Sequence, residues 1–316
     1  MILKNYLKLN RQILLTGVSS FTGCWFAKIL HEAGYNLVCP LPREKKYYTD
    51  LKKQRLRFLP PEIEVIFNAP FGSDNFFQIL DRKFDLLCLH GSYVLDYGKA
   101  SFRFSEAISQ NLHRIEDVLR KALEFDIKGL IWTSSIFENA IRIDSKKTNV
   151  PLWFKYALSK KMCGMSLEHL CWEKNINFGR FVISNPFGPL QDKKFAHFLA
   201  KSFIEKESFE VKTPDYVRDL IHVRHLAFAY CKMIDSFFTK EPLIFLDPCE
   251  YVGSLLSFAK LFYNEFSVRR GYLCKVTYCE MSFTEPLELV NKIDVSSTIE
   301  NYDPSLCWDE LVNYYE

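Results

Sequence analysis

Features typical of several protein classes are missing from this chain of 316 residues. No run of about 18 apolar residues occurs, so we expect no membrane-spanning helix. The formal net charge is only +3 and the basic residues are scattered, which argues against a nucleic-acid partner. Low-complexity segments and internal repeats are also lacking, whereas a hydrophobic content of 48% is enough for a substantial core.

The ten cysteines form no C-x-x-C pair. Cys274 and Cys279 are five residues apart and have no histidine near them, so we expect no metal site. A disulfide framework is a poor explanation for cysteines scattered through apolar segments of so long a chain, and we expect free thiols in a reducing cytoplasm. Residues 1–12 lead directly into an apolar strand, and we expect no signal peptide there.

Apolar segments of strand length alternate with segments of helix length. Such alternation is typical of an α/β protein with a doubly wound parallel sheet. The strand-like segments are 13–15, 37–39, 65–67, 86–89, 130–132 and 181–183.

A candidate dinucleotide-binding turn follows the first of these strands. It reads Thr16-Gly17-Val18-Ser19-Ser20-Phe21-Thr22-Gly23 and leads into a helical run over 24–34. We expect Gly17 to allow the tight turn and Gly23 to let the helix pack on the strand, with the helix N-terminus facing a pyrophosphate. Ser20 replaces the middle glycine of the strict G-x-G-x-x-G pattern, so an ordinary strand–turn–helix corner is the alternative.

Tyr156 and Lys160 form a Y-x-x-x-K pattern. Residues four apart share one face of a helix, and a nearby ammonium lowers the pKa of a phenol, which would make Tyr156 usable as an acid or base. The alternative is a helical face that carries one tyrosine and one lysine by chance. About twenty residues earlier, the apolar strand Gly129–Ser135 ends in hydroxyl groups.

Together these segments resemble the extended short-chain dehydrogenase/reductase family, of the kind that acts on nucleotide-activated sugars. The resemblance spans nearly the whole chain, and the matching segments occur in the family's order. They are Thr16–Gly23, Asp85–Ser92, Asn111, Thr133–Ser135, Tyr156 with Lys160, Arg180–Pro189, Val217–Val223, and Ile293–Ser296 with Pro304.

The resemblance implies two interleaved domains. Residues 1–185 would form the Rossmann domain that binds the dinucleotide, and a segment near 216–240 would return to it. Residues 186–316 would mostly form a smaller C-terminal substrate-binding domain.

The resemblance also assigns catalytic roles. Tyr156 would be the acid/base on a sugar hydroxyl or ketone, and Lys160 would bind the nicotinamide ribose and lower the pKa of the tyrosine. Ser135 would hydrogen-bond the same substrate oxygen, with Ser134 as the second candidate. A hydroxyl that only caps its own turn is the alternative for Ser135.

Two further residues would bind the substrate. Asn185 would contact it near its phosphates or sugar, and Arg218 would pair with the diphosphate. For Arg218 the alternative is an ion pair with Asp219 or another carboxylate. His222 is expected to be structural.

The cofactor would be NADP or NAD, with a preference for NADP. No acid follows the second strand to hold the adenine ribose, and Arg43 stands where a guanidinium would hold a 2′-phosphate. A solvated loop of charges is the alternative there. The cofactor-binding residues would be Thr16, Gly17, Ser19, Ser20, Phe21, Thr22, Gly23, Arg43, His90, Gly91, Ser92 and Lys160.

Departures from the family narrow the expected reaction. Ser135-Ile136-Phe137 replaces the T-D-E of sugar 4,6-dehydratases, so dehydration is not expected. The cysteine and histidine of enzymes that epimerise and then reduce a 4-keto sugar are also absent from their positions. Hydride transfer at one carbon remains, either 4-ketoreduction or 4-epimerisation. The alternative is a weakly catalytic sensor or scaffold that binds dinucleotide.

We also predict a homodimer. The family commonly pairs two helices with their symmetry mates, and both helices are rich in apolar residues here. The alternative is that one chain covers both faces. The residues are Ile108, Leu112, Ile115, Val118 and Leu119 on the first helix, and Met162, Met165, Leu167, Leu170 and Trp172 on the helix of Tyr156.

Overall fold

The computed structural model describes residues 11–141, 150–280, 286–300 and 302–316. The chain divides into two compact units. Unit 1 runs to Val182 and includes Tyr230–Leu246, and unit 2 comprises Ile183–Ala229 and Asp247–Glu316.

The division differs from the boundaries expected at 185 and at 216–240. The segment that returns to unit 1 begins later than expected because strand β9 (Val217–His222) pairs with other strands of unit 2. The substrate-binding role expected of unit 2 stays a prediction.

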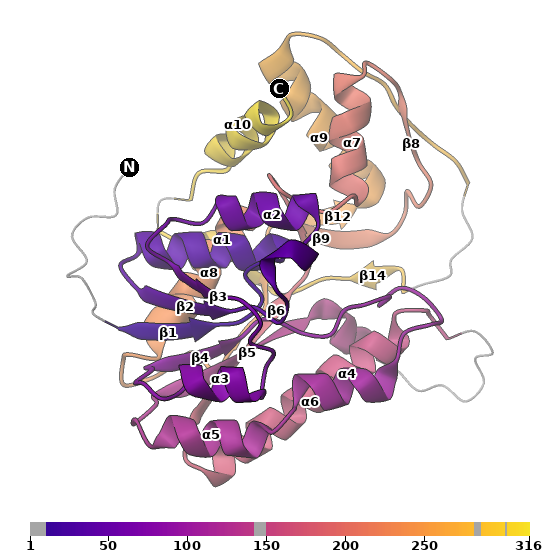
Figure 1. Cartoon of the computed structure of the whole chain (residues 1–316). Coiled ribbons are helices and arrows are strands. Elements are labelled where there is room, and N and C mark those ends of the chain that lie inside the picture. The colour runs from indigo at the N-terminus through magenta and orange to yellow at the C-terminus, as the bar shows by residue number, and fades with distance from the viewer. Residues whose placement is uncertain (1–10, 142–149, 281–285, 301) are drawn as a thin grey trace. The chain divides into compact units, whose positions relative to one another are not determined.

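The described residues of unit 1 contain a seven-stranded sheet (Figure 1). Pairs β1–β2, β1–β4, β2–β3, β4–β5 and β6–β10 are parallel, and the order of the first six strands is that of a doubly wound dinucleotide-binding sheet. The expected fold class is therefore confirmed. In sheet order the strands are β10 (Phe245–Leu246), β6 (Asn177–Ile183), β5 (Gly129–Ser135), β4 (Leu86–Leu89), β1 (Gln12–Leu15), β2 (Asn36–Pro40) and β3 (Glu64–Ile66).

Helices cover both faces of this sheet (Figure 1). On one face α3, α5 and α6 bury a continuous apolar cluster that includes Leu87 and Trp132. On the other face the ring of Phe26 in α1 stacks on Tyr230 in α8 with centroids 4.2 Å apart. The helices are α1 (Phe21–Glu32), α2 (Asp50–Arg57), α3 (Asp74–Ile79), α4 (Phe104–Asn111), α5 (Ile115–Leu123), α6 (Phe154–Glu173) and α8 (Val223–Ser236), with 3-10 turns η1 (Lys45–Tyr47) and η2 (Ile136–Ala140).

The apolar stretch from Ile108 to Leu119 is two helices and not one. Helix α4 ends at Asn111 and α5 begins at Ile115. Between them the backbone of Arg114 has a φ of 49°, in the left-handed region, which stops the helix and changes its direction.

Unit 2 is built around β9. The described residues give a four-stranded sheet in which β9 pairs with three strands, antiparallel only with β12. A second apolar cluster, with Phe187, Phe258 and Trp308, fills this unit. Its strands are β7 (Asn185–Phe187), β8 (Phe209–Val211), β9, β11 (Pro248–Cys249), β12 (Tyr251–Ser254), β13 (Val276–Tyr278), β14 (Glu288–Leu289) and β15 (Ile293–Asp294), and its helices are α7 (Phe195–Ile204), α9 (Leu255–Arg270), η3 (Val295–Ser297) and α10 (Pro304–Tyr314).

Among the residues described here, no helix is both long enough and apolar enough to cross a bilayer.

Candidate active site

The glycine turn between β1 and α1 leaves no room for side chains. Gly17 has a φ of +80°, and a Cβ added to it would lie 2.7 Å from the backbone of Gly91. A Cβ on Gly23 would lie 2.3 Å from the carbonyl oxygen of Gly17. Both glycines are therefore required where they stand. The turn presents backbone at the N-terminus of α1, which fits a pyrophosphate group.

Ser20 has a defined role in place of the expected middle glycine. It is the N-cap of α1, and its Oγ accepts the N–H of Gly23 at 3.0 Å. The same Oγ lies 3.0 Å from Nε2 of His90, and Oγ1 of Thr22 lies 3.1 Å from that nitrogen. Burial and the charge of Lys160 lower the pKa of His90 to about 3, so the ring is neutral. His90, which was expected among the cofactor-binding residues, thus holds the glycine turn through these two hydroxyl groups.

The other predicted cofactor residues surround this turn. Thr16 accepts the N–H of Gly91 at 2.8 Å through its Oγ1, so the ends of β1 and β4 are tied together. Ser19 and Phe21 are buried. Arg43 is exposed after the end of β2, and its backbone N–H donates to the hydroxyl of Tyr48 at 3.3 Å.

Lys160 is buried on α6 and points to the end of the sheet. Its Nζ donates to Ser92 Oγ at 2.7 Å and to the carbonyl oxygen of Thr133 at 2.5 Å, and it lies 3.8 Å from the ring centre of Trp132. Burial lowers the pKa of Lys160 to about 8, and the carboxylate of Glu138 opposes that shift. The lysine is therefore mostly charged at neutral pH, although it is desolvated.

Tyr156 lies on the same helix, and Ser135 ends β5. A hydrogen bond joins the two hydroxyl groups and favours the phenolate. Burial nevertheless raises the pKa of Tyr156, and the nearby Tyr97 and Glu138 raise it further. The lowered pKa that the sequence analysis expected is therefore wrong for this structure, because desolvation outweighs the stabilisation of the phenolate. Ser135 contacts the tyrosine, whereas Ser134, the second candidate, is buried beside it.

Two aromatic residues that the sequence analysis did not single out line Tyr156. The ring of Tyr97 is centred 5.2 Å from it, and that of Phe102 is centred 6.0 Å from it. Both follow β4, in a segment without helix or strand periodicity, so no pattern in the sequence marked them.

A buried carboxylate, Glu138, was also missed. It lies in η2, is 6% exposed, and accepts the N–H of Ser135 at 3.4 Å. The two preceding residues occupy the positions of the dehydratase acids. Ile136 is buried, and Phe137 stacks on Trp153 with centroids 4.9 Å apart. The structure thus has apolar side chains where dehydration would need acids.

Asn185 and Arg218 belong to unit 2 and are described within it. The amide Nδ2 of Asn185 donates to the carbonyl oxygen of Asp219 at 3.1 Å. Arg218 is 7% exposed and donates to the carbonyl oxygens of Val217 at 2.8 Å and Leu287 at 3.1 Å. Their substrate contacts stay predictions.

His222 is fully buried in the same unit. Its backbone N–H donates to Glu250 at 2.7 Å, and burial lowers the pKa of its ring well below the usual value. This environment agrees with the structural role expected for it.

A Cys–His–Glu chain is a further feature of unit 2. Cys307 Sγ lies 3.2 Å from Nε2 of His225, and Nδ1 of His225 lies 2.7 Å from Glu250 Oε1. The hydroxyl of Tyr302 donates to the same carboxylate oxygen at 2.7 Å. The order of groups is that of a nucleophilic triad, but burial raises the pKa of the thiol and both Cys307 and His225 are 2% exposed. The chain is therefore a structural link from α10 to α8. Within the described ranges, no group of three or more acidic, cysteine or histidine side chains is arranged to hold a metal ion.

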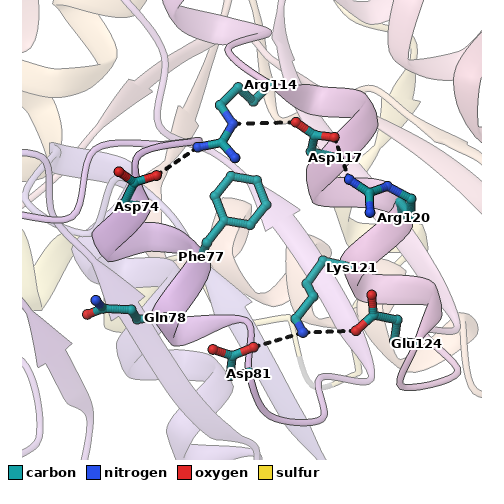
Figure 2. Close-up of a pocket in the computed structure, with 9 residues that line it drawn as sticks. All are labelled: Asp74, Phe77, Gln78, Asp81, Arg114, Asp117, Arg120, Lys121 and Glu124. Atoms are coloured by element: carbon teal, nitrogen blue, oxygen red, sulfur yellow. Dashed lines mark hydrogen bonds and ion pairs between the residues drawn. The ribbon is translucent and has the colours of Figure 1, made fainter.

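A surface hollow of about 460 Å³ lies between α3 and α5, away from these residues (Figure 2). Arg114 pairs with Asp74 at 2.9 Å, and Lys121 pairs with Asp81 at 2.8 Å, across the two helices. Each of the seven charged side chains that line the hollow takes part in an ion pair. The hollow is thus lined by a surface network of ion pairs, and none of the predicted site residues lines it.

Comparisons with known proteins identify the family of this chain. The sequence profile of the NAD dependent epimerase/dehydratase family matches residues 13–245. Curated protein sequences give no match.

Solved structures with similar folds include three 4-epimerases of UDP sugars. The UDP-glucuronic acid 4-epimerase of Bacillus cereus, solved with UDP-glucuronic acid and NAD, is 17% identical, with 96% of this chain and 98% of that chain covered and a TM-score of 0.69. The UDP-N-acetylglucosamine 4-epimerase of Methanobrevibacter ruminantium, in complex with UDP-N-acetylmuramic acid, is 15% identical over 97% and 98%, with a TM-score of 0.72. The UDP-glucose 4-epimerase of Thermotoga maritima, with UDP-glucose, is 13% identical over 96% and 98%, with a TM-score of 0.70. At identities this low, the structural matches establish a shared fold and nothing more.

Proposed function

Because this chain belongs to the NAD dependent epimerase/dehydratase family, we propose that it is an NAD(P)-dependent enzyme that exchanges hydride at C4 of a nucleotide-diphosphate sugar. One observation carries the proposal. Ser135, Tyr156 and Lys160 lie in one unit at the end of β5. Lys160 also donates a hydrogen bond to Ser92, which follows Gly91 beside the glycine turn. Proton transfer and dinucleotide binding would then occur at one edge of the sheet.

The residues of this edge have distinct tasks. Tyr156 Oη would take the proton from the sugar O4 and later return it, and Ser135 would hold that oxygen in place. Lys160 would stabilise the phenolate and bind the ribose hydroxyls. Bound nicotinamide would accept and return the hydride.

Epimerisation is the reaction that we favour over net reduction. The three similar structures reported above are 4-epimerases of UDP sugars. In an epimerisation the 4-keto sugar would be reduced on its opposite face, so no cofactor is consumed. A ketoreduction would consume one NAD(P)H for each sugar.

Turnover of UDP-glucose, UDP-glucuronic acid and UDP-N-acetylglucosamine with a catalytic amount of dinucleotide tests the proposal. Conversion to the 4-epimer without net change in absorbance at 340 nm is expected for an epimerase. Consumption of NADPH in step with product would instead establish a reductase. Bound dinucleotide without turnover of any nucleotide sugar would favour the sensor or scaffold.

The cofactor preference is a separate prediction. We expect NADP(H) to bind more tightly than NAD(H), because the exposed Arg43 follows β2 and the end of that strand, Val38–Pro42, carries no acid for the adenine ribose. The similar epimerase of Bacillus cereus was solved with NAD, which points the other way. Isothermal titration with both cofactors decides the question. Equal affinities, or no change in Arg43→Ala, would remove the argument for NADP.

A homodimer in the cytoplasm completes the proposal. The described chain has ten free cysteines, most of them buried, which suits a reducing compartment.

On α6 the side chains of Met162, Met165 and Trp172 are 44%, 56% and 75% exposed and recur on one helical face. By contrast, Val118, Leu119 and Leu167 are buried in the core of unit 1, so the proposed interface is narrower than the sequence alone suggested.

A further inference from the structure

Glu138 is a buried acid that the proposed mechanism does not use. A buried carboxylate is costly unless opposite charge and hydrogen bonds compensate it. Its two oxygens have long contacts only, with the N–H of Ser135 at 3.4 Å and with Nη1 of Arg180 at 3.9 Å. Arg180 makes its shorter contact, at 2.8 Å, with Glu168 on α6. Burial raises the pKa of Glu138, and these long contacts offset that rise only in part, so another positive charge is needed to keep the carboxylate ionised.

That charge is the ammonium of Lys160. Its hydrogen bonds go to neutral acceptors, Ser92 and Thr133, and in the described residues no carboxylate lies within 4.0 Å of it. Lys160 and Glu138 attach to the same strand end, because Thr133 and Ser135 are two residues apart on β5, roughly 7 Å along the strand. Two opposite charges buried at one strand end interact strongly, since little water screens them.

We propose that Glu138 is a positioning residue for the catalytic set: its carboxylate holds the backbone of Ser135 and supplies the counter-charge that keeps Lys160 protonated. The effect of Glu138 on catalysis rests on the proposed function. The interaction between the charges of Glu138 and Lys160 does not depend on that function. Glu138 would not touch the substrate. It would act through the two residues that do.

The other charged and titratable groups near the pair act in known directions. The charges of Arg180 and Lys161 lower the pKa of Glu138, Cys163 raises the pKa of Lys160, and the charge of Lys160 lowers the pKa of His90. The charge of Glu138 also raises the pKa of the Tyr156 phenol. Removing the charge of Glu138 should therefore lower the pKa of both Lys160 and Tyr156.

A double-mutant cycle on folding stability tests the pair without any substrate. Urea unfolding is measured for the wild type, Glu138→Gln, Lys160→Met and the double variant at pH 7 and at about pH 10. At pH 7 we expect Glu138→Gln to lower the free energy of unfolding less in the Lys160→Met background than in the wild type. The difference should be about tenfold in the unfolding equilibrium constant. At about pH 10, where Lys160 is neutral, the coupling should disappear. Additive effects at pH 7 would overturn the inference. If Glu138→Gln alone does not fold, recovery in the double variant supports the pair, and failure of both variants overturns it.

The pH dependence of kcat/KM tests whether Glu138 affects catalysis through Lys160 and Tyr156. For Glu138→Gln we expect both limbs of the profile to move to lower pH by about one unit. The matched control is Glu168→Gln, which removes the exposed carboxylate on Arg180 and should leave the profile in place. An unshifted profile in Glu138→Gln would overturn the positioning role. If no nucleotide sugar is turned over, the proposed function fails, and the unfolding cycle still decides whether Glu138 and Lys160 are coupled.

Discussion

Tyr156 illustrates at the scale of one residue how the protein and its ligands must cooperate. Burial raises the pKa of its phenol, and the hydrogen bond with Ser135 offsets only part of that shift. A phenol in this state holds its proton at neutral pH, which suits the step in which it returns a proton to the sugar O4. For the reverse step, as a base, the phenolate must be stabilised by charge nearby.

Tyr156→Phe should abolish turnover and leave dinucleotide binding nearly intact. Only the hydroxyl is removed, and a missing general acid costs on the order of 10²-fold or more in rate. Initial rates with a nucleotide sugar, together with titration of the dinucleotide, check this. Normal activity in the variant would refute the proposed mechanism.

His90 should make the protein less stable in mild acid. Its folded pKa is lowered to about 3, whereas an unfolded histidine titrates near 6.5. Below about pH 6.5 the unfolded state binds a proton that the folded state does not, so the free energy of unfolding falls by about 1.4 kcal/mol per pH unit from this group. Between pH 7 and pH 5 the wild type should lose about 2 kcal/mol more than His90→Gln, as measured by urea unfolding. Equal losses would show that the ring does not stay neutral.

The sequence predicted part of this residue set and missed the rest for physical reasons. Tyr156, Lys160 and Ser135 were found because their spacing and their place at a strand end have a chemical meaning. Glu138 and Tyr97 were missed because burial of an acid and proximity of a ring depend on tertiary packing. The direction in which the pKa of Tyr156 is shifted was mispredicted for the same reason, since a helical spacing does not show how far a side chain is desolvated.

At the scale of elements, the strands of unit 1 followed from apolar runs between helix-length segments. Strand β4 occupies Leu86–Leu89 as predicted. The break between α4 and α5 could not be predicted, because arginine carries no preference for the left-handed backbone that Arg114 adopts. Tertiary contacts stabilise it: its guanidinium pairs with Asp74 and lies 4.1 Å from the ring centre of Phe77 (Figure 2).

Substitutions at Arg114 should separate backbone strain from side-chain contacts. Arg114→Ala loses the ion pairs and keeps a left-handed residue with a Cβ, whereas Arg114→Gly loses the same contacts without that strain. We expect the glycine variant to be more stable than the alanine variant by about 1 kcal/mol in urea unfolding. An alanine variant as stable as the glycine variant would show that the backbone at this position relaxes without cost.

At the scale of the whole molecule, the sequence predicted two interleaved units but overestimated the apolar surface available for pairing. Helical periodicity marks the faces of a helix that are apolar, and it does not say which face the chain's own core covers. Leu167 and Val118 are covered by unit 1, whereas Met165 is not.

Met165→Glu should convert the proposed dimer into a monomer. A charge in the centre of the exposed stripe on α6 would be buried without a partner on association. Light scattering at micromolar concentration measures the mass. Val268→Glu on α9, which changes an exposed apolar residue outside the helices of the proposed interface, should leave the dimer intact. A wild-type monomer under these conditions would exclude the dimer.

The hydroxyl–imidazole contact at the glycine turn also has an evolutionary consequence. Ser20 caps α1 and shares Nε2 of His90 with Thr22, so a glycine at position 20 would remove the cap and leave the imidazole with a single hydroxyl partner. A change at position 90 alone would likewise take a partner from both hydroxyl groups. Positions 20 and 90 should therefore be inherited together, and lineages that keep serine at one should keep a hydrogen-bonding ring at the other.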